Sequence, residues 1–477
     1  MIVESMRTSM NRFRCVAFVT VMLLAGTSSA QSLSSAYFLS GTYTRQDLNP
    51  AFSPERAYFS LPVIGGTGMS VSSNVGASAF IYNSASYPGK LTTFMSGDVS
   101  KATFLNALPD VSKLRSSVAI DVASAGFRAF GGYGNVGLSL KSYEDVSVPK
   151  SLFAMMKSGL SDGHYMAGNA RVKSLAYADL GLGYSRNVLD NLKLGAKVHF
   201  LLGMAGGDVS INRIDANINS SEWRLMMDAK AHIGMSGLEI AGNDDGTANL
   251  DSISYRYKGL SGFGLALDFG AVYDLSDVVE GLSVSAAITD LGYLNWNKGV
   301  TLANDGKNEV VFKGFHDVSG DEDLDKQADQ LGEDVKSMIN LTEKNFESYN
   351  GGPSATFRLG VQYRLPWVDW ISAGELLTFR TGLLSCLESR TSVNIAPARW
   401  FDASLNVAFS TFGTDLGWVL VFHPKAVSLF IGSDGVRARL SKDGIPVSAS
   451  SASVMFGLKF ALGDIKERHI SDLVFID

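Results

Sequence analysis

The sequence predicts an all-β chain, a transmembrane antiparallel β-barrel of about fourteen strands, from its composition, its alternating residue pattern and the spacing of its turns. Hydrophobic residues make up 46% of the 477 residues and charged residues only 18%, against roughly 25% charged residues in a typical soluble domain. A membrane-spanning helix needs about 18 consecutive apolar residues, and no apolar run beyond the N-terminus approaches that length. A membrane that is crossed by strands accounts for both observations.

The first residues have the pattern of a secretory signal peptide. Arg7, Arg12 and Arg14 precede an apolar stretch at positions 15–26, and small residues at 28–30 follow it. We expect export to the outer membrane, with cleavage after Ala30. A membrane anchor is the less favoured alternative, because the apolar stretch is too short to span a bilayer. Cys386 is then the one remaining cysteine, so no intramolecular disulfide is expected.

Apolar and polar side chains alternate along many segments, as membrane-spanning strands require when one face meets lipid and the other the lumen. From Leu192 to Leu202 every second residue is apolar, and the intervening positions include Lys193, Lys197 and His199. A soluble β-sandwich also alternates. The barrel is favoured because short turns alternate with long polar connections, and because tryptophans such as those at 367, 370 and 400 stand beside the short turns, where an interfacial girdle would lie.

Counting the alternating segments gives fourteen crossings, an even number that starts and ends in the periplasm. The predicted crossings are 56–75, 116–130, 134–143, 173–186, 192–204, 262–273, 282–291, 355–365, 371–381, 390–395, 401–410, 415–422, 426–432 and 451–462. Residues 208–233 contain two further strand-like runs, which we interpret as a hairpin above the membrane. The predicted domains are a signal peptide (1–30), an N-terminal hatch or periplasmic segment (31–55), the barrel (56–462) and a periplasmic tail (463–477).

Charged residues within the strands are expected to face the lumen, because a lysine or arginine on the lipid face at the bilayer midplane costs roughly 2 to 4 kcal/mol. Mixed charges there are compatible with a plug of paired charges or with a polar passage, and the pattern does not separate the two. The polar residues predicted to face the lumen are Asp121, Asp179, Lys193, Lys197, His199, Asp268, Arg358, Arg364 and Asp402.

Two segments outside the strands have a helical pattern. In the long outer loop at 292–353, apolar residues repeat at steps of three and four from Leu324 to Met338, which predicts a helix from Asp321 to Ser348 beneath an acidic face. It is either a loop helix packed over the barrel mouth or a helix that binds a partner. A short apolar stretch from Leu152 to Met156 is expected to cap the mouth beside it.

Motifs for catalysis and cofactor binding are weak. The glycine pattern at 132–137 joins two predicted strands, with no helix to hold a pyrophosphate. Ser161 and His164 resemble a nucleophile elbow without the required strand and helix. The loop at 317–328 resembles a calcium loop but lacks its glycine and its bidentate glutamate. We therefore expect no enzyme, no metal and no cofactor, and the net charge of -6 gives no sign of a nucleic-acid partner.

Several short motifs resemble the long-chain fatty-acid transporter (FadL) superfamily of fourteen-stranded outer-membrane barrels, and in particular an uncharacterised branch from Bacteroidota. They are Asp47-Leu48-Asn49-Pro50-Ala51-Phe52 ahead of the first strand, Ile288-Thr289-Asp290-Leu291-Gly292 followed by Trp296, Phe422-His423-Pro424-Lys425, and Phe430-Ile431-Gly432-Ser433-Asp434 before Ile445-Pro446. The resemblance implies that Asn49, Pro50, Ala51 and Phe52 belong to a luminal hatch. It also implies that hydrophobic substrates enter from outside and leave laterally through the wall.

Two functions follow as expectations. The first is passive uptake of small hydrophobic molecules. The second is a surface or secretion-associated scaffold of the type IX kind, which the acidic helix and the outer hairpin favour. The expected partners are membrane lipids, a small hydrophobic ligand and a surface or secretion protein.

Overall fold

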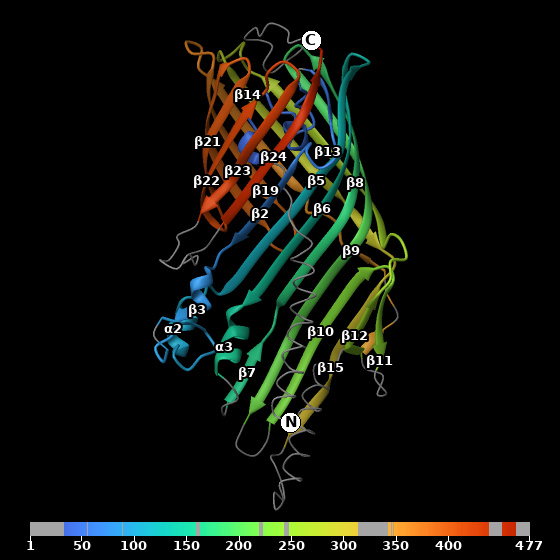
Figure 1. Cartoon of the computed structure of the whole chain (residues 1–477), viewed down its shortest axis with the longest axis vertical. Helices are drawn as coiled ribbons and strands as arrows, with labels where there is room; N and C mark the ends of the chain where they lie inside the picture. The colour runs from blue at the N-terminus through green and yellow to red at the C-terminus, as the bar shows by residue number, and fades with distance from the viewer. Residues whose placement is uncertain are drawn as a thin grey trace, which may run out of the picture.

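In a computed structural model, the chain forms one closed antiparallel barrel whose strands continue into a sheet at one end (Figure 1). The structure describes residues 33–463 except 55, 88, 159–162, 219–222, 243–247, 313–341, 345, 347 and 438–450. The predicted signal peptide and all but the first residue of the predicted periplasmic tail lie outside the described residues. Among the described residues, no helix is long and apolar enough to cross a membrane.

Fourteen strands close the barrel in the order in which they follow one another in the chain, as the alternation predicts. They are β1 (Ala57–Ser60) with β2 (Thr67–Ser73) as one interrupted strand, β5 (Val111–Ala129), β6 (Gly132–Pro149), β8 (Ala170–Leu189), β9 (Leu192–Ile218), β13 (Gly262–Asp274), β14 (Leu282–Trp296), β18 (Thr356–Arg364), β19 (Ile371–Arg380), β20 (Cys386–Ala398), β21 (Phe401–Ser410), β22 (Gly413–Phe422), β23 (Val427–Arg437) and β24 (Ser451–Leu462). The connections 130–131, 190–191, 275–281, 365–370, 399–400 and 423–426 all lie at one end, at the top of Figure 1, which we call the turn end.

The first strand differs from its prediction, because it is not continuous. Residues 56–75 were expected to form one crossing, but β1 and β2 are separated by residues 61–66. Both pieces pair with β24 on one side and with β5 on the other. Between Ser60 and Thr67 the interrupted strand advances by seven residues. Its partner β24 advances by only three over the same distance, from Lys459 to Phe456. Pro62 removes a ladder donor, and Gly65 and Gly66 weaken strand geometry, which explains the interruption.

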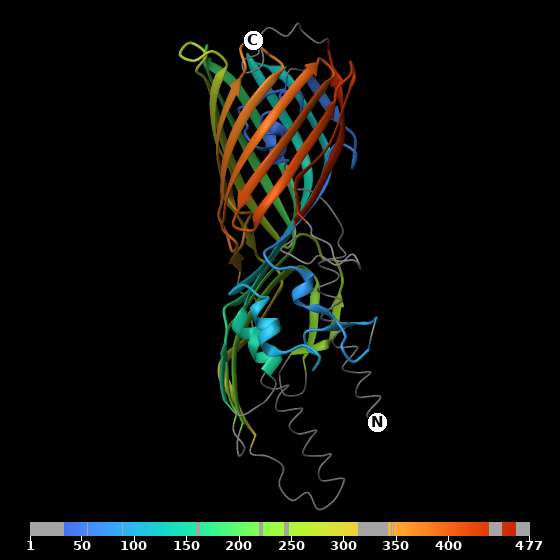
Figure 2. The same ribbon diagram turned by 90° about the vertical axis from the view of Figure 1, so that its left-hand side faces the viewer.

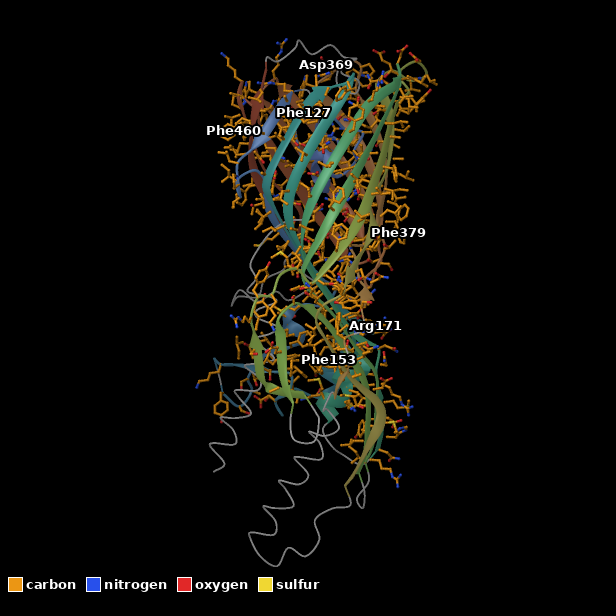
Figure 3. All side chains as sticks on the ribbon, turned by 90° about the vertical axis from the view of Figure 1, so that its right-hand side faces the viewer. Phe127, Phe153, Arg171, Asp369, Phe379 and Phe460 are labelled. Carbon is orange, nitrogen blue, oxygen red and sulfur yellow. The ribbon has the colours of Figure 1, made fainter. Side chains whose placement is uncertain are left out.

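The barrel wall separates apolar from polar side chains residue by residue. Along β18, Phe357, Leu359 and Val361 are exposed, whereas Arg358 between them is 3% exposed. Figure 3 shows Phe127, Phe379 and Phe460 on the outer surface of the wall. An apolar exterior around a polar interior is the pattern of a barrel that crosses a lipid bilayer.

An N-terminal segment, residues 33–54, lies inside the barrel (Figure 2). We call it the luminal segment. It contains the short 3-10 helices η1 (Ser34–Ala36) and η2 (Arg45–Asp47). Its first turn packs on β22 and β23, where Leu33, Ala36 and Leu39 form a buried cluster with Val419, Val421 and Phe430.

At the end opposite the turns, several strands continue as a projecting sheet. β9 runs for 27 residues, and its outer half pairs with β7 (Gly163–Ala167) and with β10 (Trp223–Met235). β10 pairs in turn with β15 (Val300–Phe312), which carries the short β16 (Thr342–Lys344). A separate hairpin, β11 (Leu238–Gly242) and β12 (Ala248–Tyr255), follows β10. The predicted hairpin at 208–233 is therefore the continuation of β9 into β10.

Trp296 closes the base of this projecting sheet. It is fully buried with Leu175, Tyr177, Leu201 and Leu294, and its indole N–H donates to the carbonyl of Gly351 next to β17 (Tyr349–Asn350). Part of the predicted helix at 321–348 is wrong: residues 342–344 form β16, because they complete the edge of β15. Residues 321–341, which hold the apolar positions of the predicted helix, lie outside the described residues.

A small subdomain sits beside the projecting sheet. It contains η3 (Ala77–Ala79), β3 (Ile81–Asn83), β4 (Leu91–Thr93), α2 (Lys101–Asn106) and α3 (Lys150–Ser158). Phe153 of α3 packs with Phe80, Phe94 and Phe104, so this residue of the apolar stretch at 152–156 belongs to the core of the subdomain. Hydrogen bonds from Ser86 and Ser84 lower the pKa of Asp98 to about 2 and fix the turn between β3 and β4.

Candidate functional site: a charged cavity beside the interrupted first strand

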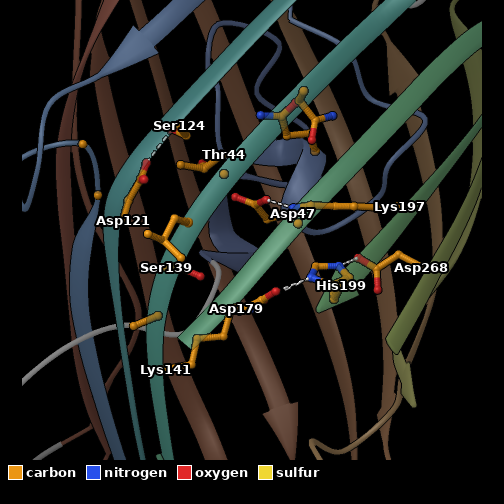
Figure 4. Close-up of a pocket in the computed structure, with 18 of the residues that line it drawn as sticks. Thr44, Asp47, Asp121, Ser124, Ser139, Lys141, Asp179, Lys197, His199 and Asp268 are labelled. Atoms are coloured by element: carbon orange, nitrogen blue, oxygen red, sulfur yellow. Dashed lines mark hydrogen bonds and ion pairs between the residues drawn. The ribbon is translucent and has the colours of Figure 1, made fainter. Parts of the chain in front are cut away.

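The largest cavity among those described, about 120 Å³, lies in the lumen between the luminal segment and the wall. Figure 4 shows charged side chains converging on it from different strands. We call it the central cavity. Its charged lining residues are Asp47, Asp121, Lys141, Asp179, Lys197, His199, Asp268, Asp290, Arg380 and Lys459.

His199 joins two aspartates across neighbouring strands. Its Nδ1 lies 2.8 Å from Asp179 of β8, and its Nε2 lies 2.9 Å from Asp268 of β13. Carboxylates only accept hydrogen bonds, so both ring nitrogens are satisfied when the ring carries two N–H groups. Asp179 also accepts from the Lys141 ammonium at 2.7 Å. The arrangement is a row of paired charges across β6, β8, β9 and β13.

A bulge in β14 supplies another part of this network. The pairing of β13 with β14 shifts at Asp268, where Thr289 and Asp290 have no one-to-one partners. Asp290 adopts a φ of 58°, and its backbone N–H donates to Asp268 at 2.7 Å. Thr289 accepts a hydrogen bond from Arg358 at 2.8 Å. The Ile288 to Gly292 motif is thus a bulge that aims polar groups into the lumen, a common role of bulges near functional sites.

The luminal segment is held by specific polar contacts rather than by loose packing. Asn49, which is fully buried, donates to the carbonyls of Ala271 and Ala286 at 3.3 Å, and its own side-chain oxygen accepts from the N–H of Ala51. Pro50 lies so close to β9 that a Cβ at Gly195 would be 2.2 Å from its carbonyl oxygen.

Further contacts tie the segment to opposite walls. Asp47 forms an ion pair of 2.9 Å with Lys197. At the start of the segment, Asp434 accepts the backbone N–H groups of Ser34 and Ser35 at 2.9 and 2.6 Å.

Near the turn end, Asp402 bridges the luminal segment to the β22–β23 turn. It accepts the N–H of Gly41 at 3.0 Å and faces His423 at 3.3 Å. Phe52, the last residue of the Asn-Pro-Ala element, packs edge-on against Tyr37 with 5.0 Å between ring centroids. Of the motifs that suggested a family resemblance, those at 47–52, 422–425 and 430–434 therefore lie where the barrel contacts its luminal segment.

The interruption of the first strand at residues 61–66, which we call the break, borders the central cavity. Gly65 and Gly66 line the cavity, while Leu61, Val63 and Ile64 are exposed on the outer surface. The backbone of the break still bonds to both flanking strands, since the Val63 N–H donates to the Asp121 carbonyl of β5 and the Ile64 carbonyl accepts from the Leu458 N–H of β24. Side chains of these two strands also meet on the inner side of the break. Lys459 of β24 and Asp121 of β5 approach to 3.2 Å.

The ion pair at the break is reinforced by hydroxyl groups. Ser124 donates to Asp121 at 2.7 Å and accepts from Lys459 at 3.1 Å, and Ser60 also donates to Asp121. The Lys459 ammonium lies 4.8 Å above the centre of the Tyr58 ring. A paired charge cluster therefore lies beside the break on its luminal side.

A second cavity, of about 30 Å³, lies toward the projecting sheet. It shares Tyr143, Asp290 and Arg380 with the central cavity, and its outer part is lined by Arg115 and Lys173. On the opposite side, residues 40–43 of the luminal segment line a small cavity at the turn end, whereas Thr44, Gln46 and Asp47 line the central cavity. The luminal segment thus lies between the central cavity and the turn end.

The predicted site residues occupy different places. Asp121, Asp179, Lys197, His199 and Asp268 line the central cavity. Lys193 and Arg358 are buried elsewhere inside the barrel, and Arg364 is half-buried at the end of β18. Asn49 and Ala51 are buried in the luminal segment, Pro50 contacts β9, and Phe52 is half-buried.

The prediction omitted four charged cavity residues of the wall, and Asp47 and Gln46 of the luminal segment. Lys141 and Lys459 lie on the polar faces of predicted strands. The expectation that charged strand residues face the lumen would therefore have identified them. Asp290 is hidden by its bulge, which breaks the alternation. Arg380 stands at the end of its strand. Gln46 lies in a segment without alternation, and only the folded chain brings it to the cavity.

A family model described as "Family of unknown function (DUF5723)" matches residues 50–434. The chain belongs to this family. A comparison with curated proteins finds no match. Within the described residues, no group of histidine, cysteine, aspartate and glutamate could hold a metal ion.

Several solved structures are similar to this DUF5723 chain, and they include a toluene transporter and a FadL homologue. The Pseudomonas putida toluene transporter TodX is 10% identical with a TM-score of 0.37, covering 93% of this chain and 97% of its own. A Pseudomonas aeruginosa FadL homologue is 11% identical with a TM-score of 0.43, covering 91% and 98%. The translocator domain of the autotransporter NalP from Neisseria meningitidis is 5% identical with a TM-score of 0.31, covering 85% and 88%. At these identities and scores, the likeness assigns no substrate to the chain.

Proposed function

We propose that the protein is an exported outer-membrane barrel that takes up small hydrophobic molecules passively and releases them sideways through its wall. The observation that carries this proposal is the central cavity, which reaches the interrupted first strand at Gly65 and Gly66. The outward-facing apolar side chains of the wall support a location in a lipid bilayer.

The positions of the cavities favour a lateral route over an axial one. The two cavities that share Tyr143, Asp290 and Arg380 lead inward from the end that carries the projecting sheet. Beyond them, the luminal segment occupies the way to the turn end. Short turns face the periplasm in bacterial barrels, so the projecting sheet would lie outside the cell. A molecule from outside then meets the break in the wall before it meets a route along the axis.

Filling the break tests this function. A Cβ at Gly66 would find ordinary contacts at 3.6 to 4.0 Å, so Gly66→Leu can fold while its side chain narrows the opening. We expect uptake of radiolabelled naphthalene by Gram-negative cells expressing the variant to fall at least about tenfold. Such a fall corresponds to a rise of about 1.4 kcal/mol or more in the free-energy barrier to passage.

Gly97→Leu is the matched control, since nothing lies within 4 Å of its Cβ position in the outer subdomain. Uptake by this control should equal that of the unchanged protein. Equal uptake by Gly66→Leu, with the barrel folded, would contradict the lateral route. No uptake by the unchanged protein would contradict the proposed function itself.

The projecting sheet favours a second candidate, a surface or secretion-associated scaffold. β9, β10 and β15 extend well beyond the barrel, and transport of a small molecule does not require them. Crosslinking in intact cells that recovers one stable protein partner would support this role, and recovery of none would count against it.

We also propose that the chain is not an enzyme. Of the pair considered from the sequence, Ser161 lies outside the described residues, and the exposed His164 pairs with Asp215 on the projecting sheet.

A further inference from the structure

Glu375 faces the outer side of the barrel wall, among the apolar side chains that contact lipid. Along β19, Leu377 and Phe379 are exposed, and Figure 3 shows Phe379 on the outer surface. Leu376, which lies between Glu375 and Leu377, is fully buried and points into the barrel. Because successive side chains of a strand point to opposite faces, Glu375 shares the outward face with Leu377 and Phe379.

The position of Glu375 is the middle of its strand. Ile371 at the turn end lies four positions before it, and Phe379 at the other end lies four positions after it. Outward residues on nearby strands are apolar and exposed, namely Val361 of β18, which pairs with Glu375, and Val407 of β21. Ionisable side chains in a membrane are costly and seldom face lipid, so one that does marks a functional site.

Two hydroxyl groups of β20 join Glu375 on the same face. Ser389 donates to one oxygen of the carboxyl group at 2.5 Å, and Thr391 donates to the other at 2.6 Å. Thr391 is exposed and is the cross-strand partner of Glu375. We call these three residues the lipid-face patch. Each carboxyl oxygen has two lone pairs, so the patch keeps hydrogen-bonding capacity that lipid tails cannot use.

The lipid-face patch is complementary to a second copy of itself. In its protonated form a carboxyl group has an O–H donor beside its acceptor oxygens, so two such groups can each donate to the other. Copies inserted in one membrane have the same orientation. A two-fold axis along the membrane normal therefore brings equal surfaces at equal depth together, as a closed dimer requires. The apolar residues around the patch then contact their counterparts.

We propose that two copies of the barrel dimerise side by side in the membrane, with their lipid-face patches at the centre of the interface. Hydrogen bonds between polar side chains contribute to the association of protein segments in membranes, where lipid tails offer no alternative partner. The dimer rests on the location in a bilayer given under the proposed function, but it does not depend on uptake.

The monomer–dimer equilibrium tests the proposal. It is measured with the full-length mature protein by sedimentation equilibrium in density-matched detergent micelles. We expect the unchanged protein to dimerise, and the dissociation constant to rise at least about tenfold in Glu375→Leu, which corresponds to about 1.4 kcal/mol. Glu375→Gln should keep the dimer, because an amide also both donates and accepts hydrogen bonds.

Thr391→Val and Thr378→Val form a matched pair of variants. Both replace a hydroxyl group with a methyl group of similar size. Thr391 belongs to the lipid-face patch, whereas Thr378 has the inward parity of Leu376, and its buried hydroxyl has no hydrogen-bond partner among the described residues. We expect a several-fold rise in the dissociation constant for Thr391→Val and no change for Thr378→Val.

A monomer at every protein concentration overturns the proposal, whatever other membrane protein binds the patch. A dimer that is unchanged in Glu375→Leu and Thr391→Val overturns it as well. If Glu375 only joined β19 to β20, Glu375→Leu would unfold at a lower denaturant concentration and keep the same sedimentation. We expect instead an equal or higher midpoint for the dilute monomer, followed by far-ultraviolet circular dichroism, because leucine faces lipid at a lower cost. A dimer without naphthalene uptake by cells would leave the interface standing and remove the uptake function.

Discussion

The side chain of Asn49 shows how a single residue can hold the luminal segment in place. Its amide satisfies carbonyl groups of two wall strands and a backbone N–H of the luminal segment, all in a fully buried position. The family resemblance placed Asn49 in a hatch, but its partners in the wall lie more than 200 positions away in the chain. No local pattern predicts such contacts.

Asn49→Leu should loosen the luminal segment, because it leaves buried backbone groups without partners at a cost of roughly 1 to 3 kcal/mol each. Arg45 lies within the luminal segment, so trypsin can cleave there once the segment is released. Mass spectrometry follows this cleavage in the purified folded protein. We expect faster cleavage in Asn49→Leu and unchanged cleavage in Asn191→Leu, which replaces an amide at an exposed turn. Protection equal to that of the unchanged protein would mean that Asn49 does not retain the segment.

At the scale of elements, the base of the projecting sheet depends on glycines around one tryptophan. A Cβ at Gly206 or Gly234 would be 2.6 or 2.7 Å from the Trp296 ring, and one at Gly203 would be 2.9 Å away. These glycines let the β9 and β10 backbones approach a large buried ring. The sequence predicted the hairpin from its alternation, but the role of the glycines appears only once distant strands meet.

Gly206→Ala should displace Trp296 and destabilise the projecting sheet by about 1 to 3 kcal/mol, the usual cost of overpacking. Hydrogen exchange should become faster in β10 and in the outer half of β9, while the barrel strands keep their protection. The adjacent Gly207→Ala is a close control, because nothing lies within 4 Å of its Cβ position. Equal exchange in both variants would contradict this role of Trp296.

For the whole molecule, alternation and turn spacing were sufficient to predict fourteen crossings and their order. Along β21, Leu405, Val407 and Phe409 are exposed and alternate with buried Ser404 and Asn406, as the energetics of lipid contact require. The prediction failed where the chain departs from regular pairing, at the interrupted first strand and at the β14 bulge. Residues of both departures line the central cavity, so irregular positions contribute to the proposed function.

The proposed lateral route requires the lumen to communicate with the lipid at the break, residues 61–66. Cryo-electron microscopy of the protein, extracted from cells in native lipid nanodiscs, tests it most directly. We predict elongated density that begins beside Gln46 and Asp47, crosses the wall beside the break at residues 61–66 and continues along the outer surface. A continuous first strand that seals the wall, or density that follows the barrel axis past a displaced luminal segment, would contradict the account.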